Sequence, residues 1–266
     1  LRRAEVGELT ARDQRRVSAW LKALDLELLG IELGGSSVRV WLLREAGNTR
    51  RGLGAYLIRR GELAPRGDEL LLQAPHSFFD KHTGKLALDL FLRTSTAVHG
   101  PRALFVNNVH RYRREDGSKG KRTGGDNPAD AAHAVDHPLA RVSARLLRKR
   151  PLQLIQLHGF AAELVDPDAI VSAGTDEPSR ASLAVQRGMQ RALPELRIAQ
   201  YGVEADRLGG TGNIQGAAAR DARRCFVHVE LADRLRERLM EDEQSRARVA
   251  VAVLEAAEEE GARGCR

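Results

Sequence analysis

Leu152-Gln153-Leu154-Ile155-Gln156-Leu157-His158-Gly159 is the stretch that decides the fold class of this chain. Residues 152–157 are apolar, with glutamine as the only interruption. A short run of this kind predicts a strand buried on both faces, as in parallel sheets that helices cover on both sides. The run leads into His158, a side chain that can bind a metal ion or transfer a proton.

Extended and helical segments alternate along the rest of the chain. We expect strands at residues 38–43, 54–58, 70–74, 103–107, 169–171, 196–202 and 226–231. We expect helices at residues 1–25, 84–98, 128–149, 179–193, 232–240 and 244–260. This order predicts an α/β sandwich around a largely parallel sheet, in which ligands collect outside the carboxyl ends of the strands.

The chain length limits the number of domains. A chain of 266 residues suits one large α/β domain or two small ones. We expect residues 1–65 to form a helix and β-hairpin region that packs on the main domain or precedes it. Residues 66–266 then form the α/β domain that carries the chemistry.

Composition and charge describe an ordinary globular protein with a basic surface. The chain is 42% hydrophobic and 30% charged, with a formal net charge of +7. A basic surface can bind nucleic acid or another anionic polymer. Here the arginines lie beside acidic residues, as in Arg234-Leu235-Arg236-Glu237-Arg238, and that pattern is typical of a solvated face. We therefore predict no nucleic-acid partner.

Membrane spans and cysteine-based metal sites are not predicted either. No apolar stretch approaches the roughly 18 residues that cross a bilayer, so no membrane partner is expected. The two cysteines form no CxxC pair, which excludes a zinc site built on cysteine. The chain begins at Leu1, and a removed leader would leave its compartment open. The oligomeric state is open as well.

A histidine and a carboxylate follow the strand expected at residues 70–74. His76 and Asp80 lie four positions apart, and Pro75 stiffens the exit of the strand. Zinc binds imidazole nitrogen and carboxylate oxygen, and ligands three to five positions apart on a turn can reach one ion. His82 is an alternative to Asp80 as the second ligand. A loop histidine beside a solvated aspartate is the alternative to a metal site.

Two further apolar runs lead to His158 and Glu230. Gly159 allows close approach to His158, which suits a third zinc ligand, although a buried histidine bonded to the backbone would look the same. Glu230 lies inside the apolar run 226–231, where a carboxylate needs a partner or a function. In hydrolytic zinc sites a buried glutamate with a raised pKa moves a proton from water to the leaving nitrogen. His228 shares the face of Glu230 and could orient it; a salt bridge between Glu230 and an arginine is the alternative.

The segment Asn107-Asn108-Val109-His110-Arg111-Tyr112-Arg113 leaves another expected strand. Asparagine and arginine at a strand exit can hold a substrate carboxylate or stabilise an oxyanion. We choose Arg111 as the catalytic arginine, because it lies soonest after the strand. The candidate substrate-binding residues are Asn107, Asn108, His110 and Arg113. A basic surface loop is the alternative.

Three further residues could support a second ion. Asp130, His133 and His137 are spaced as on one face of a helix, where they could bind metal or orient the ligands of the first ion. His82 and His228 are the other residues expected around the first ligands. The chain has no GxSxG, GxxxxGK[ST] or HExxH motif, and we expect the glycine-rich stretch 209–213 to form a rim of the active site.

Together these segments resemble the N-formylglutamate amidohydrolase-like group of the zinc carboxypeptidase superfamily, over roughly residues 65–240. The resemblance rests on Pro75-His76-Ser77 with Asp80, Asn107-Asn108-Val109-His110-Arg111, Gln156-Leu157-His158-Gly159-Phe160, and His228-Val229-Glu230-Leu231 running into Arg234 and Arg236. It implies a three-layer α/β/α sandwich with a mixed sheet, a general base at Glu230 and substrate anchoring by the Asn-His-Arg segment. The superfamily has His-x-x-Glu as its first ligand pair, whereas His76 and Asp80 are one residue further apart.

The sequence therefore predicts a zinc-dependent hydrolase of an amide or peptide bond. His76, Asp80 and His158 would hold Zn²⁺, Glu230 would be the general base, and Arg111 would polarise the carbonyl or anchor a carboxylate. The expected substrate is an N-acyl amino acid or a peptide. The alternatives are a non-catalytic protein that binds anionic polymers and a degenerate hydrolase with a structural metal.

Overall fold

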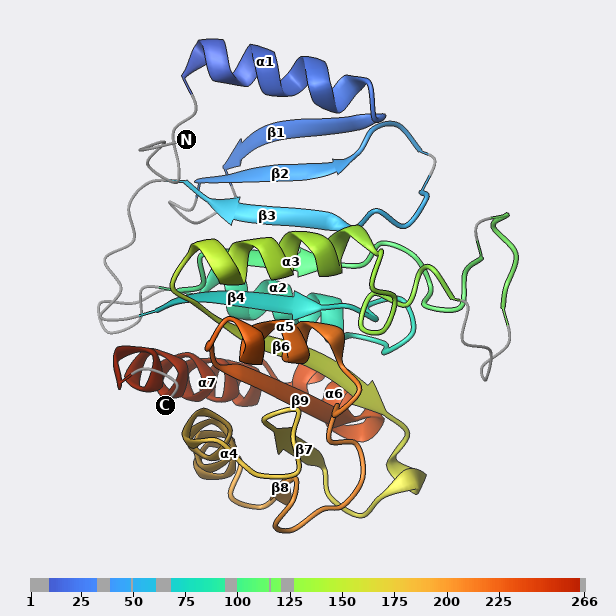
Figure 1. The fold of residues 1–266 in the computed structure, drawn as a ribbon. Helices are drawn as coiled ribbons and strands as arrows, with labels where there is room; N and C mark the ends of the chain where they lie inside the picture. Colours follow the sequence, from blue (N-terminus) through green and yellow to red (C-terminus); the bar gives the residue numbers. More distant parts are fainter. Residues whose placement is uncertain are drawn as a thin grey trace.

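The computed structural model describes residues 10–32, 39–48, 50–60, 68–93, 100–114, 116–120 and 127–263. Within them the strands form one nine-stranded sheet, in the order β1-β2-β3-β5-β4-β6-β9-β7-β8 (Figure 1). The strands are β1 Leu26–Glu32, β2 Arg39–Glu45, β3 Ala55–Arg59, β4 Glu69–Ala74, β5 Ala103–Val106, β6 Leu152–Phe160, β7 Ala169–Ser172, β8 Ile198–Gln200 and β9 Phe226–Ala232. The helices are α1 Ala11–Lys22, α2 Thr83–Leu92, α3 Pro138–Lys149, η1 Ala162–Leu164, α4 Arg180–Ala192, α5 Ile214–Asp221, α6 Asp233–Glu241 and α7 Glu243–Arg263.

The centre of the sheet is parallel, and antiparallel pairings join it to both flanks. β4 pairs in parallel with β5 and β6, and β6 pairs in parallel with β9. β3 runs antiparallel to β5 on one flank, and β7 runs antiparallel to β9 on the other. The sheet is thus mixed with a parallel centre, and the predicted α/β fold is confirmed.

Helices cover both faces of the central sheet. In Figure 1, α3 and α5 lie on the near face, and α2, α6 and α7 lie behind the strands. One hydrophobic cluster joins the far face to α2, α4, α6 and α7, and a second cluster joins the near face to α3 and α5. The predicted three-layer α/β/α sandwich is therefore the architecture of this protein.

Side chains of the central strands alternate between the two clusters. In β6, Ile155 and Leu157 belong to the far cluster, whereas Leu154 belongs to the near one. In β9, Val227 and Val229 likewise face the far cluster. Strands with apolar residues on both faces need a helical layer on each side, which is why these runs form the centre of the sheet.

The helix expected at residues 128–149 is wrong in its first part. α3 begins at Pro138 with His137 as its N-cap, and the backbone of residues 127–137 forms turns. Proline disfavours helical backbone at the residue before it, so a helix starts at this point instead of passing through it. Asp130, His133 and His137 therefore do not share a helix face.

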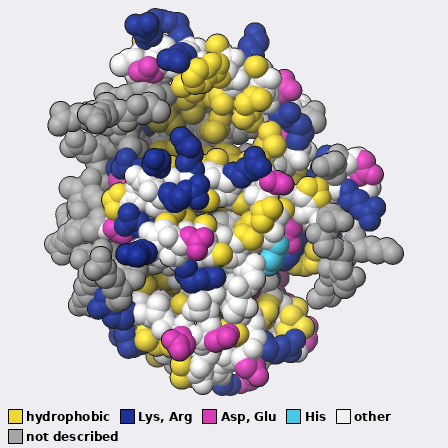
Figure 2. All heavy atoms as spheres, viewed as in Figure 1, with side chains coloured by type: hydrophobic (Ala, Val, Ile, Leu, Met, Phe, Trp, Pro, Cys, Tyr) yellow, Lys and Arg dark blue, Asp and Glu magenta, His cyan; other side chains and the backbone are white. Residues whose placement is uncertain are grey.

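The amino-terminal residues extend the same sheet. β2 and β3 pair as the expected hairpin, and β1 adds a further antiparallel strand. Figure 2 shows hydrophobic side chains gathered on the near face over these strands. Residues 1–9 and 94–98 of two expected helices lie outside the described residues. Within the described part of the chain, no helix is both long enough and apolar enough to cross a membrane.

Candidate metal centre

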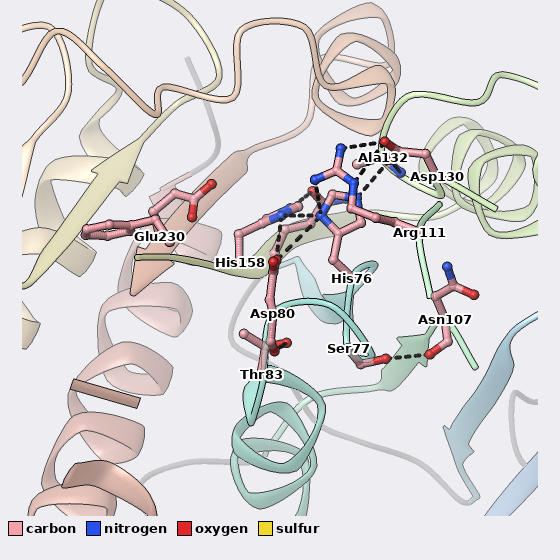
Figure 3. Close-up of polar contacts among 12 residues, drawn as sticks. His76, Ser77, Asp80, Thr83, Asn107, Arg111, Asp130, Ala132, His158 and Glu230 are labelled. Carbon is pink, nitrogen blue, oxygen red and sulfur yellow. Dashed lines mark hydrogen bonds and ion pairs between the residues drawn. The ribbon is translucent and has the colours of Figure 1, made fainter. Parts of the chain in front are cut away.

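Four of the predicted site residues lie at the carboxyl ends of three neighbouring strands (Figure 3). His76 and Asp80 lie in the turn that follows β4, while His158 belongs to β6 and Glu230 to β9. β6 and β9 pair in register, with His158 opposite Glu230. Residues opposite each other in paired strands point to the same face, so these two side chains emerge next to each other.

His76, Asp80 and His158 bring three ligand atoms to one point. Nδ1 of His76 lies 3.2 Å from Nδ1 of His158 and 3.5 Å from Oδ2 of Asp80. Nδ1 of His158 lies 3.6 Å from the same oxygen. Ligand atoms around a tetrahedral zinc ion, with bonds of roughly 2.0–2.2 Å, lie about 3.3–3.6 Å apart. The three spacings fit one zinc-sized ion.

The protons of both imidazoles point away from that ion position. Nε2 of His76 lies 2.8 Å from Oδ1 of Asp130, and Nε2 of His158 lies 3.1 Å from Oε1 of Gln156. Both partners are acceptors, so each ring carries its proton on Nε2 and presents the lone pair of Nδ1 to Asp80. Oδ2 of Asp80 is buried and accepts no hydrogen bond within the described residues. Nδ1 of His76 faces Nη1 of Arg111 at 3.2 Å, whereas Oδ2 of Asp80 has no donor among the described residues. Acceptors that face one another repel unless a positive charge lies near them, and a metal ion at this point would supply it.

The protonation states of the ligands suit metal binding. Burial lowers the pKa of His158 to about 4, so its imidazole is neutral at pH 7. Burial opposes ionisation of Asp80, but its contacts with His158 and His76 outweigh burial and hold its pKa well below the ordinary value. Burial also acts to lower the pKa of His76, but the hydrogen bond to Asp130 and the neighbouring negative charge of Asp80 raise it overall. Protons therefore compete with a metal at His76 as the pH falls.

Glu230 is buried beside the three ligands. Its Oε1 lies 3.7 Å from Nε2 of His228, and its Oε2 has no hydrogen-bond partner within the described residues. Burial raises the pKa of Glu230 to about 8, and the charge of Asp80 acts in the same direction. Figure 3 shows the carboxylate turned toward His158. A buried carboxyl group that titrates near neutral pH is suited to proton transfer.

Arg111 and Asp130 reach the ligands from the segment between β5 and α3. Nε and Nη2 of Arg111 both donate to Oδ2 of Asp130, the former at 3.1 Å. Nη1 of Arg111 donates to Nδ1 of His76 at 3.2 Å. Asp130 thus holds both the guanidinium and the ring of His76. Nδ1 of His133 lies 3.0 Å from the same carboxylate, in a turn and not on the expected helix.

The two predicted asparagines hold the loop that carries Arg111. Nδ2 of Asn107 donates to the carbonyl of Ala129 at 2.7 Å. Nδ2 of Asn108 donates to Oε2 of Glu45 at 2.5 Å. Both amide groups are thus engaged within the protein, in contacts that tie the loop to neighbouring segments.

His110 and Arg113 lie in the same loop. The ring of His110 packs against Phe79 and Tyr112, with centroid distances of 5.2 and 5.4 Å. Nδ1 of His110 also accepts a hydrogen bond from the Tyr112 amide at 3.2 Å. Arg113 forms an isolated backbone bridge with Lys119. Within the described part of the chain, neither side chain makes a hydrogen bond or ring contact with the three ligands.

His82 is the N-cap of α2, where its backbone is left-handed with φ of 76°. The described residues contain three clusters that could hold a metal, namely His76 with Asp80 and His158, His76 with Asp130 and His133, and His158 with His228 and Glu230. Neither His82 nor His137 belongs to these clusters. Of the two candidates for the second ligand, the structure brings Asp80 to His76 and His158.

Sequence reasoning missed a group of buried amide side chains behind His158. They are Gln73, Gln156, Asn213 and Gln215. Two of them interrupt the apolar strands β4 and β6, and that interruption is the signal that could have identified them.

Gly159 has a packing role that the sequence suggested only in outline. A Cβ at this position would overlap the guanidinium of Arg236, which is buried and donates to the carbonyls of Phe160 and Leu231. Gly159 therefore makes room for the buried guanidinium of Arg236 at the ends of β6 and β9.

Comparison with known proteins gives distant structural likenesses. No protein-family model and no curated protein matches the chain. A metallo-carboxypeptidase from Burkholderia cenocepacia is similar with 13% identity and a TM-score of 0.46, covering 93% of this chain and 68% of its own. Thrombin activatable fibrinolysis inhibitor is similar with 10% identity and a TM-score of 0.48, covering 92% and 73%. A metallo-carboxypeptidase from Pseudomonas aeruginosa, in complex with (2-guanidinoethylmercapto)succinic acid, has 12% identity and a TM-score of 0.44, covering 94% and 68%.

Proposed function

We propose that this protein is a zinc-dependent hydrolase of an amide or peptide bond, with His76, Asp80 and His158 as the zinc ligands. One observation carries the proposal: Nδ1 of His76, Nδ1 of His158 and Oδ2 of Asp80, an oxygen without a hydrogen-bond partner among the described residues, lie at the spacing of a tetrahedral site. Catalytic zinc sites commonly use three protein ligands and leave a fourth position open. Zinc in this place would supply Lewis-acid chemistry, acidifying water and polarising a carbonyl.

Glu230 is the proposed general base and acid. Its Oε2 has no hydrogen-bond partner among the described residues, so it can accept a proton from the attacking water and deliver it to the leaving nitrogen. Proton transfer in both directions requires a group whose pKa lies near the working pH, and burial raises the pKa of Glu230 to about 8. His228 lies beside it and is placed to orient the carboxyl group.

Arg111 is the proposed electrophilic residue. Asp130 holds its guanidinium, and Nη1 points at Nδ1 of His76, so the positive charge borders the space in front of the ligands. A guanidinium in this position can stabilise an oxyanion or bind a substrate carboxylate in a bidentate way. We infer that the substrate is an N-acyl amino acid or a peptide with a carboxylate near the scissile bond. The sequence resemblance to N-formylglutamate amidohydrolases points to the same class.

Metal content tests the proposal. We expect the purified protein, loaded with zinc and then dialysed, to retain one zinc ion per chain by elemental analysis. His158→Ala and Asp80→Ala each remove one ligand and should lose that zinc, whereas His82→Ala should keep it. Equal zinc retention in His158→Ala and the unmodified protein would refute the ligand assignment.

A further inference from the structure

Gln156 lies directly behind the candidate ligand His158. Its Oε1 is 3.1 Å from Nε2 of His158 and 2.7 Å from Nδ2 of Asn213. Its Nε2 is 2.6 Å from Oε1 of Gln73 and 3.3 Å from Oε1 of Gln215. All four hydrogen-bonding directions of this fully buried amide are thus used within the protein.

The orientation of the Gln156 amide follows from backbone groups whose donor or acceptor character is fixed. Oδ1 of Asn213 accepts from the backbone amides of Gln215 and Gly216, both at 3.0 Å, because Asn213 is the N-cap of α5. Its Nδ2 must therefore point at Gln156. The atom of Gln156 that receives this donor must be Oε1, and not the amide nitrogen.

Two other backbone carbonyls lead to the same orientation from the opposite side. The hydroxyl of Ser143 donates to the carbonyl of Leu139 at 2.6 Å and accepts from Nε2 of Gln73, which leaves Oε1 of Gln73 facing Gln156. Nε2 of Gln215 donates to the carbonyl of Ala131 at 2.5 Å, which leaves Oε1 of Gln215 facing Gln156 as well. Gln156 therefore donates toward β4 and α5 and accepts on the side of His158.

We propose that Gln156 is a positioning residue that fixes the tautomer of His158. Because Oε1 of Gln156 only accepts, the His158 proton resides on Nε2 and the Nδ1 lone pair faces Asp80 and His76. Without this acceptor, nothing holds the proton on Nε2, and it can move to Nδ1, which lies 3.2 Å from Nδ1 of His76 and 3.6 Å from Oδ2 of Asp80. The buried amides thereby keep His158 ready to bind a cation. The link to zinc depends on the proposed function, whereas the tautomer itself does not.

Three variants separate positioning from stability. Gln156→Leu removes the acceptor and should weaken zinc binding about 10- to 100-fold. Gln156→Glu, buried and protonated on Oε2, keeps an acceptor for His158 and a donor for Gln73, so zinc affinity should stay within about threefold of the parent protein. Gln73→Leu breaks the same chain of hydrogen bonds without touching His158, and it should lower stability while leaving zinc affinity within about threefold. Affinity is measured by competition with a chelating dye, and folding by circular dichroism.

Nitrogen-15 NMR of the metal-free protein tests the tautomer directly. We expect the His158 proton on Nε2 in the parent protein, Gln156→Glu and Gln73→Leu, and a shift toward Nδ1 in Gln156→Leu. An unchanged tautomer in folded Gln156→Leu, or equal zinc affinities of Gln156→Leu and Gln73→Leu, would overturn the role of Gln156. If the parent protein binds no zinc but the tautomer shifts as expected, the proposed function fails and the positioning role stands.

Discussion

The two faces of β6 and β9 are built from different chemistry. The face toward α2, α4, α6 and α7 is apolar at the centre of these strands, as at Ile155 and Val229. Its polar exception is Gln153 near the start of β6, whose Nε2 donates to the carbonyl of Ala257 in α7 at 2.6 Å. The opposite face begins apolar at Leu154 and then carries Gln156 and His158 toward the end of the strand. Burying polar groups costs free energy unless each is hydrogen-bonded, so the second face is the poorer way to stabilise a sheet. Beyond the ends of these strands, Oδ2 of Asp80 has no hydrogen-bond partner among the described residues, as the proposed role in metal binding requires.

Among substitutions on the polar face, replacing Glu230 should have the largest effect, and that effect is on turnover. Glu230→Gln keeps the size of the side chain but cannot accept the proton, so turnover should fall about 10²- to 10⁴-fold. Zinc content should stay at the parent level, because Glu230 is not a proposed ligand. The assay combines elemental analysis with hydrolysis rates on a panel of N-acyl amino acids and peptides.

Glu237→Gln is the matched control for that substitution. Glu237 is an exposed residue of α6, and its carboxylate pairs with Lys81 at 3.1 Å. The control makes the same chemical change, from a carboxyl group to an amide, and it should change neither turnover nor zinc content, since exposed ion pairs contribute little. Parent rates in Glu230→Gln would exclude Glu230 as the base.

Titration of Glu230 should make the free energy of unfolding of the metal-free protein depend on pH. The pKa of the folded state is raised from the ordinary value of 4.5 to about 8, so the folded protein favours the protonated form. The stability that the folded protein gains from keeping Glu230 protonated is complete below about pH 4.5 and is lost as the pH rises to about 8. The loss should reach several kcal/mol, because a pKa difference of one corresponds to about 1.4 kcal/mol.

Urea denaturation across this pH range, in the parent protein and in Glu230→Gln, measures the effect. Glutamine stays neutral, so the stability difference between the two proteins should be constant below pH 4.5 and should change between pH 4.5 and 8 in favour of the variant. A difference that does not vary with pH would show that Glu230 is not buried in its protonated form.

The sequence was sufficient for the features that depend on one segment at a time. Apolar runs identified the central strands, and the polar residues at their ends identified His158 and Glu230, which the pairing of β6 with β9 places opposite each other. The contact between Asp130 and His76 joins residues 54 positions apart through a turn that local spacing does not specify. The Gln73–Gln156 hydrogen bond depends on β4 lying beside β6, and strand order is a property of the whole sheet.

The smallest effect is expected on the apolar face, one residue away from Gln156. Ile155 is 1% exposed in the far cluster, and Ile155→Val removes one methylene from a packed core. Such a change costs about 0.5–1.5 kcal/mol of stability, through lost contacts and a small cavity. Because Ile155 points away from His158, zinc affinity and the His158 tautomer should stay at their parent values. Urea denaturation and the chelator competition measure both quantities in one preparation, and a tenfold loss of zinc affinity would show that the two faces are not independent.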